Sequence, residues 1–178
     1  MSMHSGRPKP LDKLVDLPLT QLRGPRELGL DTIRAAGGAC RAVEQLGERL
    51  EQRANRLESA HDPACVYARA FAELCRRLAD ALHKEGWSDA EWVALLTLRM
   101  VEHYLRALNE RAAGSPSHGV WQGSFDASDQ RATSVREELV LGLTASLVHD
   151  LPLALGEVGM HAPNGASHLR DYHDINEV

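Results

Sequence analysis

The chain has 178 residues and a formal net charge of −5, from 20 Lys and Arg residues against 25 Asp and Glu residues. This length suits a single domain, and a composition of 43% hydrophobic and 25% charged residues excludes a chain that is disordered throughout. The negative charge argues against a nucleic-acid partner, because no broad basic patch is available to neutralise phosphates.

The composition also predicts the fold class and the compartment. The 26 Leu and 23 Ala residues far outnumber the 11 Val and 2 Ile residues, a bias that favours helix over sheet. No run of about 18 apolar residues predicts a membrane span, and no apolar segment of signal-peptide type opens the sequence. Three cysteines without a C-x-x-C spacing favour free thiols in a reducing compartment. We therefore expect a cytoplasmic, soluble, all-α protein with no membrane partner.

Residues 1–28 are predicted to form an extended arm, because four of the eight prolines fall within them. The arm carries leucines that could pack on the domain or on a neighbouring subunit. Residues 29–178 are predicted to form a single helical domain, and a homodimer through the arm or the first helix is a further expectation.

Periodicity and capping signals predict a compact bundle of four to five helices. The expected ranges are about 31–58, 63–84, 89–112, 134–158 and 167–178. The first helix has a heptad-like seam of small and apolar residues, and Gly37 and Gly38 are expected to weaken its first turns. The helix over 89–112 is apolar around much of its circumference, which is typical of a central helix.

Residues 113–133 are predicted to form a long loop, because four of them are Gly or Pro. Trp121 and Phe125 lie within it and are expected to pin the loop to the body of the domain. The helix that follows begins with a capping-box pattern at Ser134 and Glu137. Pro152 is expected to kink it. Its predicted inward stripe consists of Leu139, Leu143, Leu147, Asp150 and Ala154.

The last 30 residues hold four of the nine histidines, including His149 and His168. Asp150 lies on a predicted core stripe, and a buried carboxylate needs a partner because an isolated buried charge is costly. His168 and Asp171 stand three residues apart and can share a helix face. His103 lies on an inward row of the most apolar predicted helix.

Two chemistries suit these residues. A His–Asp pair can transfer protons near neutral pH, with His149 as the general acid or base and Asp150 and Asp171 to orient it or hold a charge. His168 is a further catalytic candidate. The same four residues are also candidates to bind a divalent metal, although nothing in the sequence requires a cofactor. The doublet His149-Asp150 is similar to that of the all-α HD phosphohydrolase superfamily, for which His103 would be the upstream histidine and Asp171 or Asp174 the downstream aspartate.

Residues 62–178 also resemble an uncharacterised bacterial, actinobacterial-type family of helical proteins of unknown function. The resemblance rests on Tyr104-Leu-Arg-Ala-Leu108, on Trp121 with Phe125, on the segment 144–155 and on Asp171-Tyr-His-Asp-Ile-Asn176. It implies an α fold and a polar site at Asp150, Asp171 and Asn176. In the middle motif, Thr144, Ser146 and Val148 stand where the family has Asn, His and Asn, which implies either a remodelled site or an activity exchanged for binding.

We therefore expect a small enzyme with a His/Asp acid–base site that acts on a small, mostly apolar molecule, as in a tailoring step of bacterial specialised metabolism. Two alternatives stay open, a metal-dependent hydrolase of HD-like type and a non-catalytic helical module for ligand binding or interaction. The residues expected to contact the substrate are His103, Trp121, Phe125, Ser146 and Asn176.

Overall fold

The computed structural model describes residues 25–84, 86–117, 119–130 and 133–178, and this part of the chain is all-helical, as the composition predicted. Most of the predicted arm lies outside the described residues, and the described chain begins with a helix at Pro25. The elements, more numerous than the four to five predicted, are α2 (Pro25–Ala35), α3 (Ala39–Ser59), α4 (Cys65–Leu82), α5 (Ala90–Ala112), α6 (Gly119–Asp129), α7 (Val135–Ala145), a π-helical turn η2 (Ser146–Asp150), α8 (Leu151–Val158) and α9 (Leu169–Ile175).

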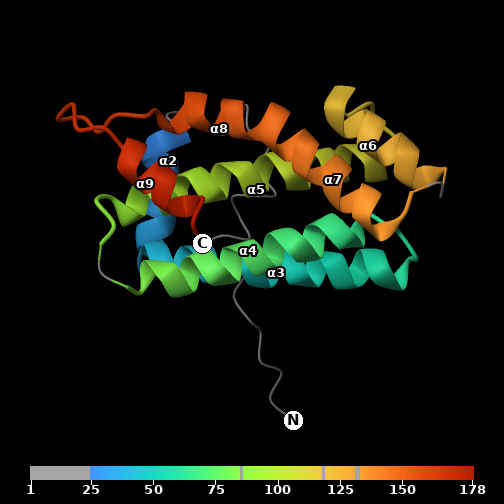
Figure 1. Ribbon diagram of the computed structural model, residues 1–178, viewed down its shortest axis with the longest axis horizontal. Coiled ribbons are helices and arrows are strands. Elements are labelled where there is room, and N and C mark those ends of the chain that lie inside the picture. The colour runs from blue at the N-terminus through green and yellow to red at the C-terminus, as the bar shows by residue number, and fades with distance from the viewer. Residues whose placement is uncertain (1–24, 85, 118, 131–132) are drawn as a thin grey trace, which may run out of the picture.

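The helices form three layers (Figure 1). The antiparallel pair α3 and α4 makes one outer layer, α5 runs through the middle, and the rod of α7, η2 and α8 makes the opposite layer with α6 beside it. Helix α2 crosses one end of the stack and packs against α3, α5 and α8. Helix α9 packs against α5.

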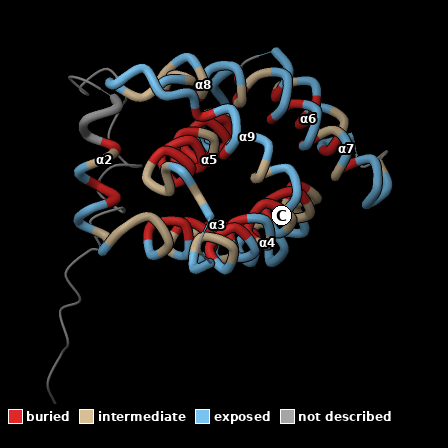
Figure 2. Tube along the Cα trace, turned by 60° about the vertical axis from the view of Figure 1, so that its left-hand side comes forward, coloured by how far each residue is buried: buried red, intermediate tan, exposed pale blue. Residues whose placement is uncertain are grey.

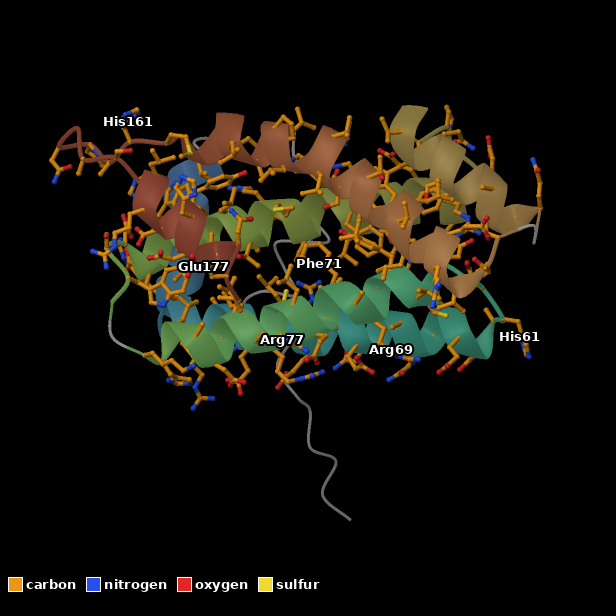
Figure 3. All side chains as sticks on the ribbon, in the orientation of Figure 1. His61, Arg69, Phe71, Arg77, His161 and Glu177 are labelled. Atoms are coloured by element: carbon orange, nitrogen blue, oxygen red, sulfur yellow. The ribbon has the colours of Figure 1, made fainter. Side chains whose placement is uncertain are left out.

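The pairing of α3 with α4 depends on small residues at the seam, as predicted. Gly47 is buried in α3, and a Cβ at that position would lie 3.3 Å from both the Ala72 carbonyl oxygen and Cys75 Cβ. The side of this helix pair that faces away from α5 carries charged residues. On α4, Phe71 points between the layers toward α5, whereas Arg69 and Arg77 point outward (Figure 3).

Helix α5 is buried along most of its length, which confirms the prediction of a central helix (Figure 2). Trp92 and Val93 near its start and Tyr104 near its end are each no more than 1% exposed. Two polar positions on the same helix, Arg99 and His103, are also buried, at 1% and 6% exposure. The centre of the molecule therefore includes ionisable side chains.

Two predicted boundaries are wrong. A continuous helix over residues 31–58 is interrupted between α2 and α3, where Gly37 and Gly38 adopt φ values of 97° and 105° that residues with a Cβ rarely adopt. The predicted loop over 113–133 contains α6. Its Trp121 and Phe125 are buried at 1% and 2% exposure, so packing of these aromatic rings outweighs the low helix propensity of the glycines around them.

The rod from Val135 to Val158 is a continuous helix of 24 residues whose start has the predicted capping box. The predicted inward stripe is wrong for Leu143 and Leu147, which are 43% and 55% exposed. The buried row instead recurs at every fourth residue: Glu138, Gly142, Ser146, Asp150, Ala154 and Val158. On a regular α-helix, residues four positions apart are offset by roughly 40° around the axis, so a row with this spacing winds around the helix. The π turn has more residues per turn and therefore reduces the accumulated offset.

Candidate functional site

The inner side of the π turn presents Asp150 to the centre of the molecule. The residue is fully buried, and its Oδ1 accepts a hydrogen bond of 3.0 Å from Nε1 of Trp121 on α6. Asp150 also lies at the junction of the π turn with α8, a position that packs against α5. The buried carboxylate therefore has a hydrogen-bond partner, as predicted, but an indole was not among the partners that the sequence suggested.

His149 contacts the same carboxylate oxygen. Its Nδ1 lies 2.9 Å from Asp150 Oδ1, and its side chain is 18% exposed. An ionised Asp150 carboxylate can only accept, so in that state the imidazole carries its proton on Nδ1 and donates it to Oδ1. This tautomer makes Nε2 the basic nitrogen of His149.

Burial sets the electrostatics around Asp150. Desolvation raises the pKa of its carboxyl group, whereas the hydrogen bonds from His149 and Trp121 lower that pKa and so moderate the rise. The other carboxylate oxygen, Oδ2, is buried without a hydrogen-bond partner among the described residues. Two further polar side chains, Tyr67 and Ser146, are buried in this part of the core, and desolvation raises the pKa of the tyrosine.

A pocket of about 70 Å³ lies beside the pair. It has room for a group of a few heavy atoms, because a single water needs roughly 10–15 Å³ on the same measure. Helices α5, α6 and α8 and the π turn all contribute to its wall. The lining residues are His103, Arg106, Ala107, Glu110, Trp121, His149 and Leu153.

His103 is held neutral on the α5 side of this pocket. Burial lowers the pKa of its imidazole to about 4, and the positive charges of Arg106 and Arg99 act in the same direction. Glu157 Oε1 lies 3.3 Å from Nε2 and favours the protonated ring, but desolvation and the two arginines outweigh it. The neutral ring can therefore offer a donor and an acceptor without adding charge.

Behind His103 lies a buried ionic cluster that sequence reasoning missed. Arg99 donates to Glu102 at 2.6 Å and lies 3.5 Å from Glu157. Desolvation raises the pKa of Glu102, and Arg99 opposes that rise. A signal was present, since Arg99 and Glu102 stand three residues apart in a helix predicted to be apolar around much of its circumference.

His168 and Asp171 belong to a different part of the fold. Asp171 is fully buried and accepts hydrogen bonds from the backbone N–H groups of Ser88 and Asp89, at 2.7 and 2.9 Å. The His168 ring stacks on Trp92 with a centroid separation of 4.7 Å and an interplanar angle of 9°. These contacts anchor α9 to the start of α5.

The predicted metal ligands are therefore not brought together. Within the described ranges, no three His, Cys, Asp or Glu side chains form a group that could hold a metal ion. The contacts of His149 and Asp150 involve α6 and the π turn, whereas those of His168 and Asp171 involve the start of α5.

The residues predicted to contact the substrate are likewise only partly brought together at the pocket. His103 and Trp121 line the pocket, and Phe125 stacks against Trp121 at 5.5 Å. Ser146 is buried one helical turn before Asp150. Asn176 is exposed after α9, where its Nδ2 donates to the Tyr172 carbonyl oxygen, so its role in the structure is that of a local cap.

Neither a search of curated proteins nor a search of solved structures found a match to this chain. A family model described as a family of unknown function, DUF5995, matches residues 43–178, which begin within α3, extend beyond α9 and include every residue of the pocket. The match covers about three quarters of the printed sequence and extends further toward the N-terminus than the resemblance over 62–178. The chain belongs to this family of unknown function, DUF5995.

Proposed function

We propose that the chain is a small all-α enzyme in which His149 acts as a general acid or base on a small molecule bound in the pocket beside Trp121. The observation that supports this proposal is the hydrogen bond from His149 Nδ1 to a fully buried Asp150, at the wall of a pocket. A carboxylate that accepts from Nδ1 orients the imidazole, so proton transfer would proceed through Nε2, an atom that is buried in the wall beside the pocket.

The proposed chemistry needs no group beyond the chain itself. Nε2 of His149 would take a proton from a hydroxyl, a water or an acidic carbon of the substrate, and the imidazolium would return that proton to the leaving atom. Asp150 would stabilise the imidazolium, as a buried acceptor whose other donor, Trp121, keeps it in place. The neutral His103 would hydrogen-bond the substrate within the same wall.

The lining of the pocket bears on the substrate. Arg106, Glu110 and the two histidines place polar groups around a space of about 70 Å³, while Trp121 and Leu153 supply apolar surface. This mixture suits the reacting end of a mostly apolar molecule, with a polar group entering the pocket and the apolar remainder lying outside it.

A generic proton-transfer reporter tests the proposal without knowledge of the substrate. In 5-nitrobenzisoxazole, a base removes the ring C–H proton while the N–O bond breaks, which releases a coloured cyanophenolate. We expect the wild-type protein to open this ring at least tenfold faster than His149→Gln, because a positioned general base contributes roughly 10²- to 10⁴-fold. Asp150→Asn should retain an intermediate rate, because the base stays but loses its orienting carboxylate.

The control is His173→Gln, which removes an exposed histidine of α9. It should react like the wild type, and far-ultraviolet circular dichroism should show that all variants are folded. Equal rates for wild type and His149→Gln would contradict a base at this position. That outcome would favour the alternative of a non-catalytic helical module for ligand binding or interaction.

A further inference from the structure

The outward side of the rod formed by α7, η2 and α8 is apolar. Val140, Leu143, Leu147 and Val148 are 59%, 43%, 55% and 61% exposed, and we refer to these four residues as the outer apolar face. They are spaced so that they lie on one side of the helix, opposite the buried row. Between Leu139 and Gly156 the sequence has no Lys, Arg or Glu, and its one Asp is buried.

Exposed apolar side chains scattered singly need no explanation, but a contiguous row along one helix indicates a surface that another group covers. The chain offers three occupants for this face: a membrane, a second copy of the protein and a segment of the chain itself. Their requirements differ in charge, area and reach, and the described residues allow each to be compared.

A membrane suits the length of the rod but not its charge. By length and composition the 24 residues from Val135 to Val158 could cross a bilayer, with 28% of the apolar window buried inside the protein. The buried side, however, holds Asp150 and packs on α5. A helix that lies on an anionic membrane carries flanking Lys and Arg, whereas here Arg136 is followed by Glu137 and Glu138 in a chain of net charge −5.

A second copy would bury too little area through this face alone. A helix of 24 residues is roughly 36 Å long. With a width of about 10 Å for one helix face, each copy would bury on the order of 400 Å², about half of the roughly 800 Å² per partner in a specific, stable interface. A segment of the same chain needs less area, because its effective concentration is already about millimolar.

The segment that precedes α2 has the right position and composition. Helix α2 packs against α8, α5 and α3, and the chain continues from its C-terminal end into α3, so its Pro25 end lies on the α8 side of the stack (Figure 1). Residues 11–22 lie outside the described residues, and half of them are large and apolar: Leu11, Leu14, Val15, Leu17, Leu19 and Leu22. They precede Pro25 by at most 14 positions, a reach of roughly 45 Å that exceeds the length of the rod.

From this combination we propose that residues 11–22 pack on the outer apolar face of the same molecule and cover it. The charged side chains within that segment, Asp12, Lys13 and Asp16, find no charged counterpart on the face and would point to solvent. The segment would then lie over the outside of the π turn whose inside holds His149 and Asp150.

Photocrosslinking of the full-length chain tests the proposal. Leu147 is replaced by p-benzoylphenylalanine, and light (¹⁴N) and heavy (¹⁵N) protein are mixed before irradiation. We expect cross-links between position 147 and residues 11–22 in which both peptides carry the same isotope. The matched control is the same replacement at Gln52, an exposed position on α3 in the opposite layer, which should give no such product.

Every other pattern would overturn the proposal. Cross-linked peptides of mixed isotope would show that a second copy covers the face, and cross-links that avoid residues 11–22 would exclude the segment as its occupant.

A second measurement is independent of cross-linking yield. The double variant Leu14→Asp/Leu17→Asp should raise the fluorescence of bound bis-ANS severalfold over the wild type by uncovering the face, whereas Asp12→Asn/Asp16→Asn should not. Unchanged fluorescence in the first variant would contradict the proposal.

Discussion

Asp150 illustrates how one buried oxygen can organise a site. Its Oδ1 accepts from Trp121 on α6 and from its own neighbour His149, while its backbone joins the π turn to α8. Hydrogen bonds to a charged group contribute roughly 1.5–3 kcal/mol each, about twice the value for neutral pairs. The donors also favour the ionised carboxyl group against the desolvation that raises its pKa.

Trp121→Phe should therefore destabilise the protein by about 2–3 kcal/mol, because it removes the indole donor and leaves a buried carboxylate with one partner fewer. The matched control is Trp87→Phe. That indole donates to the backbone carbonyl of Ala81 at 3.0 Å in a half-buried position, and its loss should cost about 1 kcal/mol. Urea unfolding of both variants measures the difference, and equal losses would contradict the special weight given to the carboxylate.

The residue scale also shows what sequence could and could not predict about the site. A carboxylate on an inward row must have a partner, and that prediction for Asp150 is confirmed. The identity of the partner was out of reach, because Trp121 lies 29 residues away in a segment that its glycines made resemble a loop. For Asp171 the spacing to His168 indicated a side-chain pair, but its partners are backbone N–H groups more than 80 residues away, which no local pattern encodes.

At the scale of single elements, the contact of α7 with α4 depends on one missing side chain. Gly142 faces the core, and a Cβ there would overlap the ring and the Cβ of Tyr67. The tyrosine in turn packs edge-on against Tyr104 of the central helix at 5.0 Å. Helix α7 can therefore approach α4 only where this glycine allows it.

Gly142→Ala should destabilise the protein by about 1–3 kcal/mol, as expected when a methyl group is forced into a packed interior. Gly156→Ala is the control on the same rod. An added Cβ at Gly156 meets no atom within 4 Å, and replacing a helical glycine by alanine there should leave stability unchanged or raise it by up to about 1 kcal/mol. The melting temperatures of the two variants should thus shift in opposite directions or differ by several degrees. A higher melting temperature for Gly142→Ala than for the wild type would show that α7 can move away from α4.

The start or end of a helix could be predicted where a sequence motif has one structural meaning. It could not be predicted where the same motif is compatible with two structures. The capping box at Ser134 and Glu137 was predicted and is present. The pair Gly37–Gly38 is compatible with a weakened helix or with a break, and only the packing of α2 across the layers decides for the break. The inward face of the rod was misassigned because Leu143 and Leu147 fit a regular period, whereas the π turn changes the period within the helix.

On the scale of the whole molecule, ionisable groups lie inside an interior that is mostly apolar. His103 is neutral within it because burial lowers the pKa of the ring to about 4. In the unfolded chain the same ring titrates near 6.5. Its contribution to folding stability is therefore fully present above about pH 6.5 and is lost as the pH falls toward 4, since only the unfolded chain takes up the proton in that range.

We expect the free energy of unfolding to fall by up to about 3 kcal/mol more in the wild type than in His103→Gln between pH 7 and pH 4. The raised pKa values of Asp150 and Glu102 act in the opposite sense, because the stability associated with their protonated forms is lost as the pH rises. Both proteins share these carboxyl groups, so the difference isolates the histidine. Urea unfolding at several pH values measures it, with His173→Gln as the exposed control; parallel curves for wild type and His103→Gln would contradict a buried neutral ring.

The π turn also bears on how the length of the rod can vary during evolution. A π turn is equivalent to an α-helix with one residue inserted. Deleting one outward residue, Leu147 or Val148, would restore a regular helix and keep α7 and α8 in phase with the layers on which they pack. The same deletion would rotate His149 relative to the pocket. The fold could therefore tolerate both the insertion of one residue in this helix and its later deletion. The site beside Trp121 would form with the insertion and disappear with the deletion.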